Sequence, residues 1–165
     1  MARSHKVDIS GLLAGGRQML VDDEVPIEAF EGIEFPDPAR VRLELAYADR
    51  MLVVGGKIDV TAVGSCDSCL DRVERAVHAD VEERLDPWRA REDDPFGESN
   101  VITGNRLDVA DLAQQVVLSE LPMGLRCSQD CKGLCDTCGA NRNASGCSCD
   151  NGERRGESKM ENPAQ

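Results

Sequence analysis

The sequence predicts an α+β fold, namely an antiparallel β-sheet with one packed helix and a C-terminal cysteine-rich segment that binds zinc. Three observations carry this prediction. Apolar and polar residues alternate over successive segments between residues 40 and 85, residues 109–121 carry apolar side chains at helical spacing, and six of the eight cysteines follow residue 126. These patterns are typical of half-buried strands, an amphipathic helix and a metal-binding segment.

The first residues predict little regular structure. Residues 5–9 have the pattern of a short edge strand. We expect a loop after them, because Gly15 and Gly16 favour turns and the run Asp22, Asp23 and Glu24 is strongly polar.

Two consecutive strands are predicted next. In residues 40–48, apolar side chains occupy every second position, namely Val41, Leu43, Leu45 and Tyr47. Asp49 and Arg50 suit a turn, and residues 51–63 read as a second strand. We expect Gly55 and Gly56 to form a bulge within it, because glycine inside a strand often marks one.

Residues 73–85 fit two patterns. Alternating apolar positions indicate a strand, whereas Val73, Val77 and Val81 also fit a helical stripe. The β-branched valines favour the strand.

A connector and a helix complete the core. Residues 86–100 are rich in charge, proline and glycine and predict a flexible connector that Trp88 anchors onto the core. Asp108 is suited to cap a helix over residues 109–121, which Pro122 ends.

The predicted organisation is therefore an acidic sheet-plus-helix core (1–126), a zinc-binding segment (127–149) and a disordered tail (150–165). The net charge is −12, and residues 1–126, with 14 basic and 25 acidic side chains, carry −11 of it. This acidity, with only 3% aromatic residues, argues against a broad RNA-binding surface and favours basic protein partners.

The first 20 residues lack the apolar run of a secretory signal, and no apolar stretch is long enough to cross a bilayer. We expect a cytoplasmic protein without a membrane partner. In that reducing compartment, eight cysteines indicate metal ligands or redox thiols before disulfides.

The C-terminal cysteines have the spacing of a zinc site. In Cys135-Asp136-Thr137-Cys138-Gly139, a tight turn can present two thiolates to one ion, and Gly139 tolerates the left-handed backbone that such a turn needs. Cys147 and Cys149 supply a second pair. The sequence predicts a closed tetrahedral zinc site here, with local disulfides or unligated thiols as the alternatives.

The remaining four cysteines form a second candidate zinc site, made of Cys66, Cys69, Cys127 and Cys131. Cys127 and Cys131 are expected on one face of a short helix, since positions four apart are neighbours there. The site closes if the helix near residue 110 packs across the sheet and returns Cys127 to the end of the second strand. Redox-active or free thiols are the alternative, although no helix begins at Cys69 as it does in thioredoxin-type motifs.

Three segments carry a recognisable pattern. These are Cys66-Asp67-Ser68-Cys69-Leu70-Asp71-Arg72-Val73, the stretch Leu118-Ser119-Glu120-Leu121-Pro122-Met123, and the long run Cys131-Lys132-Gly133-Leu134-Cys135-Asp136-Thr137-Cys138-Gly139-Ala140-Asn141-Arg142-Asn143. All three resemble segments of the YceD family. The resemblance covers about residues 40–149. It implies an α+β fold with an antiparallel sheet and a role in the processing or accumulation of large-subunit ribosomal RNA.

We therefore expect a non-enzymatic zinc-binding factor that supports large ribosomal subunit assembly. A closed site of four cysteines leaves no position for water or substrate, so its zinc orders structure and does no chemistry. The expected partner is an assembling ribosomal particle, contacted through a basic ribosomal protein, with the RNA reached indirectly. The alternatives are a redox-switched zinc chaperone and a thiol oxidoreductase. Neither His5 nor His78 lies in a motif that makes it a catalytic base.

Overall fold

The structure is a computed structural model that describes residues 5–88, 101–144, 147 and 149. Its elements are β1 (Lys6–Asp8), α1 (Ser10–Leu13), β2 (Met19–Val25), β3 (Ala39–Ala48), β4 (Met51–Ser65), β5 (Arg72–Leu85), β6 (Ile102–Thr103), β7 (Arg106–Asp108) and α2 (Val109–Glu120). The predicted α+β class is confirmed. The single sheet and single helix of the prediction were incomplete, because the described residues form two antiparallel sheets and two helices.

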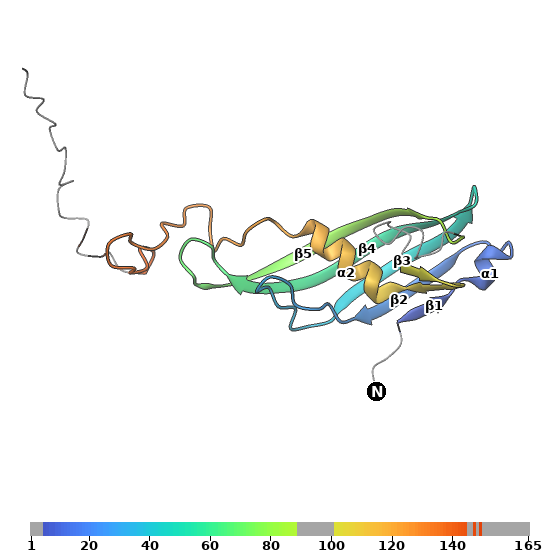
Figure 1. Cartoon of the computed structure of the whole chain (residues 1–165), viewed down its shortest axis with the longest axis horizontal. Helices are drawn as coiled ribbons and strands as arrows, with labels where there is room; N and C mark the ends of the chain where they lie inside the picture. Colours follow the sequence, from blue (N-terminus) through green and yellow to red (C-terminus); the bar gives the residue numbers. More distant parts are fainter. Residues whose placement is uncertain (1–4, 89–100, 145–146, 148, 150–165) are drawn as a thin grey trace, which may run out of the picture.

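The larger sheet has the strand order β2-β3-β4-β5, and the smaller has the order β1-β7-β6. Figure 1 shows α2 lying across one face of the larger sheet, with the cysteine-rich segment continuing past the end where β4 turns into β5. The predicted strands at residues 40–48, 51–63 and 73–85 are confirmed as β3, β4 and β5. The helical alternative for residues 73–85 was wrong, because β5 pairs with β4 along its whole length.

The expected loop around Asp22, Asp23 and Glu24 was wrong, because these residues lie in β2. The buried side chains of this strand are Val21 and Val25. Asp22 and Glu24 point to the opposite, solvent-facing side, where their register partners on β3 are Arg42 and Arg40. Opposite charges across neighbouring strands make acidic residues compatible with a strand.

The predicted bulge at Gly55 and Gly56 was also wrong, because the register with β3 and β5 runs through both glycines without an inserted residue. Gly56 instead allows two backbones to approach closely. Its φ is +152°, and a Cβ added there would overlap the carbonyl oxygen of Arg42. A side chain is therefore excluded at this position for steric reasons.

The core fills the space between one face of the larger sheet and the elements that cover it. The apolar stripe of α2 is buried against the sheet, and it consists of Val109, Leu112, Ala113, Val116 and Val117. Leu12 of α1 and Ile9, which directly precedes α1, are also buried in this core. The sheet's opposite face carries the charged side chains, so the sheet is covered on one side only.

The predicted start and end of the helix are confirmed. The backbone N–H of Asp111 donates to Oδ1 of Asp108 over 3.2 Å, so Asp108 caps α2. The helix ends at Glu120, two residues before Pro122, which has no N–H with which to continue it. The predicted edge strand at residues 5–9 is confirmed as β1, which pairs with β7.

Trp88 contacts the sheet through Tyr47, near the end of β3. Its Nε1 donates to the hydroxyl of Tyr47 over 3.1 Å, while the residue is 61% exposed. Most of the predicted connector (89–100) and the predicted tail (150–165) lie outside the described residues. None of the helices within the described ranges combines the length and apolar character needed to cross a membrane.

We expect Gly56→Ala to lower the free energy of unfolding by about 1–3 kcal/mol, because alanine at this φ is strained and its methyl group meets the Arg42 carbonyl. Gly55→Ala is the matched control, since the nearest atom to its Cβ is 3.9 Å away. The control should change stability by less than about 1 kcal/mol. Urea unfolding of the two variants decides the matter, and equal losses would contradict the steric role of Gly56.

Candidate metal centres

The eight cysteines gather into two groups of four, and each group could hold a metal ion. Within each group the four Sγ atoms lie within 4.8 Å of one another. We call Cys66, Cys69, Cys127 and Cys131 the sheet-end quartet, and Cys135, Cys138, Cys147 and Cys149 the C-terminal quartet. The structure thus brings together the two sets that the sequence analysis grouped, and all eight cysteines are free thiols.

Each quartet is built around a turn with the same hydrogen-bond pattern. In each turn, the N–H of the first cysteine donates to the carbonyl five residues later, and the N–H four residues later donates back to the carbonyl of that cysteine. The first turn pairs Cys66 with Asp71 over 2.8 Å and Leu70 with Cys66 over 2.9 Å, and the second pairs Cys135 with Ala140 and Gly139 with Cys135, both over 2.8 Å. We call these two segments the knuckles.

Both knuckles place the residue after their second cysteine in the left-handed region. Gly139 has a φ of 71°, as predicted, and Leu70 has a φ of 63°. A leucine pays an energetic cost of about 1–2 kcal/mol there that glycine does not. The hydrogen bonds of the first knuckle therefore hold Leu70 in a conformation that its side chain disfavours.

The sheet-end quartet forms because three chain segments meet where β4 ends. The backbone N–H of Asp67 donates to the carbonyl of Leu125 over 2.9 Å, and the N–H of Leu134 donates to the carbonyl of Ser68 over 3.0 Å. The closure predicted from the packing of α2 across the sheet is confirmed. The expected short helix through Cys127 and Cys131 was wrong, because a turn in which the Cys131 N–H donates to the Ser128 carbonyl brings the two thiols together.

Backbone N–H groups favour the thiolate of the first cysteine in each knuckle. Those of Cys127 and Ser68 lower the pKa of Cys66 to about 6. Those of Cys138 and Thr137 likewise lower the pKa of Cys135 to about 6. An amide that donates to the thiolate stabilises the charged form, which is also the form that binds metals.

The pKa values of the other thiols of the sheet-end quartet are shifted in both directions. The Asn143 amide lowers the pKa of Cys131. The neighbouring Cys131 thiol raises the pKa of Cys127. A hydrogen bond from the backbone of Asp71 lowers the pKa of Cys69, but burial and the three neighbouring thiols outweigh it and raise that pKa.

The C-terminal quartet behaves similarly. Contact with Cys135 raises the pKa of Cys147, and contact with Cys138 together with burial raises the pKa of Cys149 to about 12. Neighbouring thiolates repel one another, so four of them cannot ionise together without a cation. A bound divalent ion removes that repulsion.

The sulfur spacing suits tetrahedral coordination. A zinc ion with Zn–S bonds of about 2.3 Å places its sulfurs about 3.8 Å apart. In the sheet-end quartet, Cys66 and Cys131 Sγ lie 3.8 Å apart, and Cys69 and Cys127 Sγ lie 3.6 Å apart. Four soft thiolate ligands in this arrangement are compatible with zinc.

Three polar residues that the sequence analysis did not assign to a site link the two quartets. Asn143 Nδ2 donates to Cys131 Sγ over 3.3 Å, and Asn141 Nδ2 donates to Asp71 Oδ2 over 2.7 Å. Asp71 Oδ2 in turn lies 3.5 Å from Cys69 Sγ. The two asparagines sit between the cysteine pairs of the C-terminal quartet, and no sequence pattern indicated their contacts because their partners lie elsewhere in the chain.

The histidines lie apart from both quartets. His78 is an exposed residue whose Nδ1 lies 2.6 Å from Asp59 Oδ1, and this contact lowers the pKa of Asp59. The prediction of an ordinary surface histidine is confirmed. His5 Nδ1 lies 2.9 Å from Asp23 Oδ2 and connects the start of the chain to β2.

Fold and site together define a small α+β protein with two four-cysteine clusters at one end of its main sheet. Residues 54–163 match the family described as large ribosomal RNA subunit accumulation protein YceD, and the chain belongs to this family. The match begins inside β4, later than the resemblance noted from residue 40, and includes all eight cysteines. No curated protein and no solved structure matches the chain.

We expect Asn143→Ala to weaken metal binding at the sheet-end quartet about tenfold or more, because a lost hydrogen bond to a ligand typically has an effect of this size. Titration of the reduced, metal-free protein with Co²⁺ measures the affinity of each quartet. Asn105→Ala, in the exposed turn between β6 and β7, is the matched control and should bind Co²⁺ like the unmodified protein. Identical titrations of the two variants would contradict a link through Asn143.

Proposed function

We propose that this protein is a non-enzymatic, zinc-binding factor that supports large ribosomal subunit assembly in the cytoplasm. Membership of the YceD family is the observation that carries the proposal, since the family is described by its role in accumulation of large-subunit ribosomal RNA. The finer parts of the proposal are zinc as the ion, the ligand sets, the partner and the absence of catalysis. They rest on the geometry and charge of this chain.

Zinc in both quartets is a structural ion in this proposal. Four cysteine ligands close the coordination sphere, so no position is left for an activated water or a substrate. The segment from Cys127 to Cys149 carries few buried apolar residues, with Leu134 only partly buried. Binding of zinc contributes about 10–16 kcal/mol in small zinc peptides, which is enough to order such a segment.

The zinc-binding segment (127–149) is thereby joined to the acidic core (1–126) through shared ligands. Cys66 and Cys69 belong to the core, whereas Cys127 and Cys131 belong to the segment. An ion in the sheet-end quartet fixes the segment against the end of the sheet. The segment then serves as a rigid recognition element beside the acidic surface.

The proposed direct partner is a basic ribosomal protein within an assembling large subunit. The net charge of −12 supports a basic partner and opposes direct contact with the phosphate backbone of RNA. Large-subunit ribosomal RNA is therefore reached through the protein partner.

We expect the reduced protein to contain two zinc ions per chain. Cys135→Ser with Cys138→Ser should leave one ion, and Cys66→Ser with Cys69→Ser should also leave one, because each pair belongs to a different quartet. Elemental analysis of the three folded proteins measures this. A folded double variant with unchanged zinc content contradicts the ligand set that it alters, and iron in place of zinc contradicts the choice of ion.

We also expect depletion of the protein to lower mature large-subunit ribosomal RNA more than small-subunit RNA. Gradient sedimentation and RNA quantification after depletion measure the effect, and re-expression of the unmodified protein is the control. Unchanged subunit ratios in a cell without a second family member contradict the assignment to ribosome assembly. Cross-links only to oxidised, unfolded proteins would favour a redox-switched chaperone instead.

A further inference from the structure

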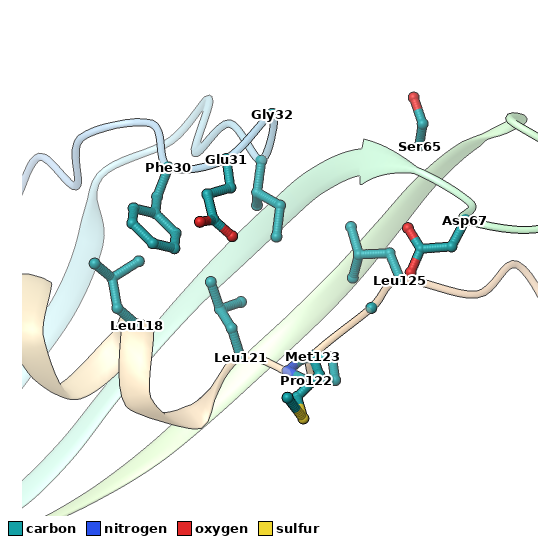
Figure 2. Close-up of a pocket in the computed structure, with 12 residues that line it drawn as sticks. Phe30, Glu31, Gly32, Ser65, Asp67, Leu118, Leu121, Pro122, Met123 and Leu125 are labelled. Carbon is teal, nitrogen blue, oxygen red and sulfur yellow. The ribbon is translucent and has the colours of Figure 1, made fainter.

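A groove runs beside the sheet-end quartet, between the turn at residues 30–33 and the segment that follows α2. It has a volume of about 360 Å³. Figure 2 shows Phe30 and Glu31 reaching from the turn toward Leu118 and Leu121 at the end of α2, with Leu125 and Asp67 at the other end of the groove. None of the cysteines of the two quartets lines this groove.

The groove is formed by segments far apart in the chain that hydrogen bonds hold in place. Gln114 of α2 and Glu28 form two hydrogen bonds of 2.7 and 3.2 Å, which join the loop before the turn to the helix. Glu34 and Val63 exchange two backbone hydrogen bonds of 2.7 and 2.8 Å on the far side of the turn. The Asp67–Leu125 hydrogen bond closes the end, so the groove exists without a partner.

The turn itself has an unusual backbone. Phe30 and Ile33 exchange two hydrogen bonds across Glu31 and Gly32, and both central residues have positive φ, of 48° and 81°. Glycine adopts this conformation without strain, but glutamate does not. The two Phe30–Ile33 hydrogen bonds keep Glu31 in this conformation, and its side chain lines the groove.

The lining combines exposed apolar side chains with carboxylates. Phe30 is 44% exposed, and Met123 is fully exposed. The described lining residues include two acidic ones, Glu31 and Asp67, and no basic one. Neither carboxylate forms an ion pair or a side-chain hydrogen bond with another described residue. Unpaired carboxylates beside apolar surface complement a cation carried next to an apolar side chain.

We propose that this groove binds an extended basic segment of a protein partner, with an apolar side chain against Phe30, Leu121 and Met123 and flanking arginines or lysines against Glu31 and Asp67. The inference rests on the proposed function and names the surface that meets the basic partner. Exposed apolar residues in a pre-formed groove supply affinity, and the carboxylates select for positive charge.

The position of the groove also assigns a role to residues of two motif segments that are not themselves metal ligands. Leu118, Leu121, Pro122 and Met123 come from the stretch after the middle of α2, and Asp67 lies between the two cysteines of the first knuckle. Because Asp67 and Leu125 flank ligands of the sheet-end quartet, an ion bound there holds one end of the groove.

Binding of labelled synthetic peptides to the full-length, zinc-loaded protein tests the proposal by fluorescence anisotropy. The first peptide alternates arginines with leucine and phenylalanine, and the second has alanine in place of leucine and phenylalanine. We expect the first to bind at least about tenfold more tightly, because the charges are equal and only the apolar contact differs. A third peptide, with glutamate in place of arginine, should show no binding.

Two matched pairs of variants locate the site. Met123→Lys and Glu31→Lys alter the groove, whereas Leu20→Lys and Glu44→Lys alter two exposed residues that are register partners on the outer face of the sheet. Met123→Lys is compared with Leu20→Lys, and Glu31→Lys is compared with Glu44→Lys. The two variants of each comparison change the net charge equally, so non-specific attraction of a basic peptide falls by the same amount in both. The groove variants should weaken binding of the first peptide about tenfold relative to their partners, with unchanged zinc content and thermal unfolding.

Equal binding of the first two peptides overturns the proposal, as do equal effects of groove and control variants. A single-stranded RNA oligonucleotide that binds more tightly than the first peptide and displaces it also overturns it. These measurements use purified protein and do not depend on ribosomal RNA levels. Failure of the peptide experiment therefore overturns the proposal that the groove binds a basic segment. The proposed role in ribosome assembly is decided by the depletion experiment alone.

Discussion

The junction between the β4–β5 turn and the segment after α2 is the contact on which the rest of the functional end depends. The Asp67–Leu125 hydrogen bond and the Leu134–Ser68 hydrogen bond bring three segments together there. This junction gathers Cys66, Cys69, Cys127 and Cys131, and it also closes the groove. The packing of α2 across the sheet sets the path of the chain into this junction. The geometry of the sheet-end quartet therefore depends on the packing of the core.

The two knuckles show how backbone geometry prepares a thiolate. Each knuckle turns its chain with the same pair of hydrogen bonds. Backbone N–H groups of Cys127 and Ser68 donate to Cys66, and those of Cys138 and Thr137 donate to Cys135, so the pKa of both cysteines falls to about 6. The pKa of Cys69, Cys147 and Cys149 is raised instead. Preparation by the backbone is therefore partial, and a cation is needed to bring all four sulfurs of a quartet to the charged form.

The main sheet separates two kinds of surface. One face is covered by α2 and the smaller sheet, while the other carries cross-strand charge pairs such as Arg40 with Glu24 and Lys57 with Asp80. Such exposed pairs contribute little to stability. At the groove, Glu31 and Asp67 lie beside apolar surface and pair with no other described residue, which makes the cysteine-bearing end chemically different from the solvated face.

The sequence by itself determined the local features of this protein. Alternation predicted β3, β4 and β5, the Asp108 cap and apolar stripe predicted α2, and cysteine spacing predicted the second knuckle, because each depends on neighbours within a few residues. Tertiary structure decided the rest. Asp22 and Glu24 are strand residues because β2 buries Val21 and Val25 and pairs with β3 along its whole length, and Gly56 is needed because β3 approaches it. The contacts of Asn141 and Asn143 and the lining of the groove likewise join residues far apart in the chain, and only packing fixes which distant groups meet.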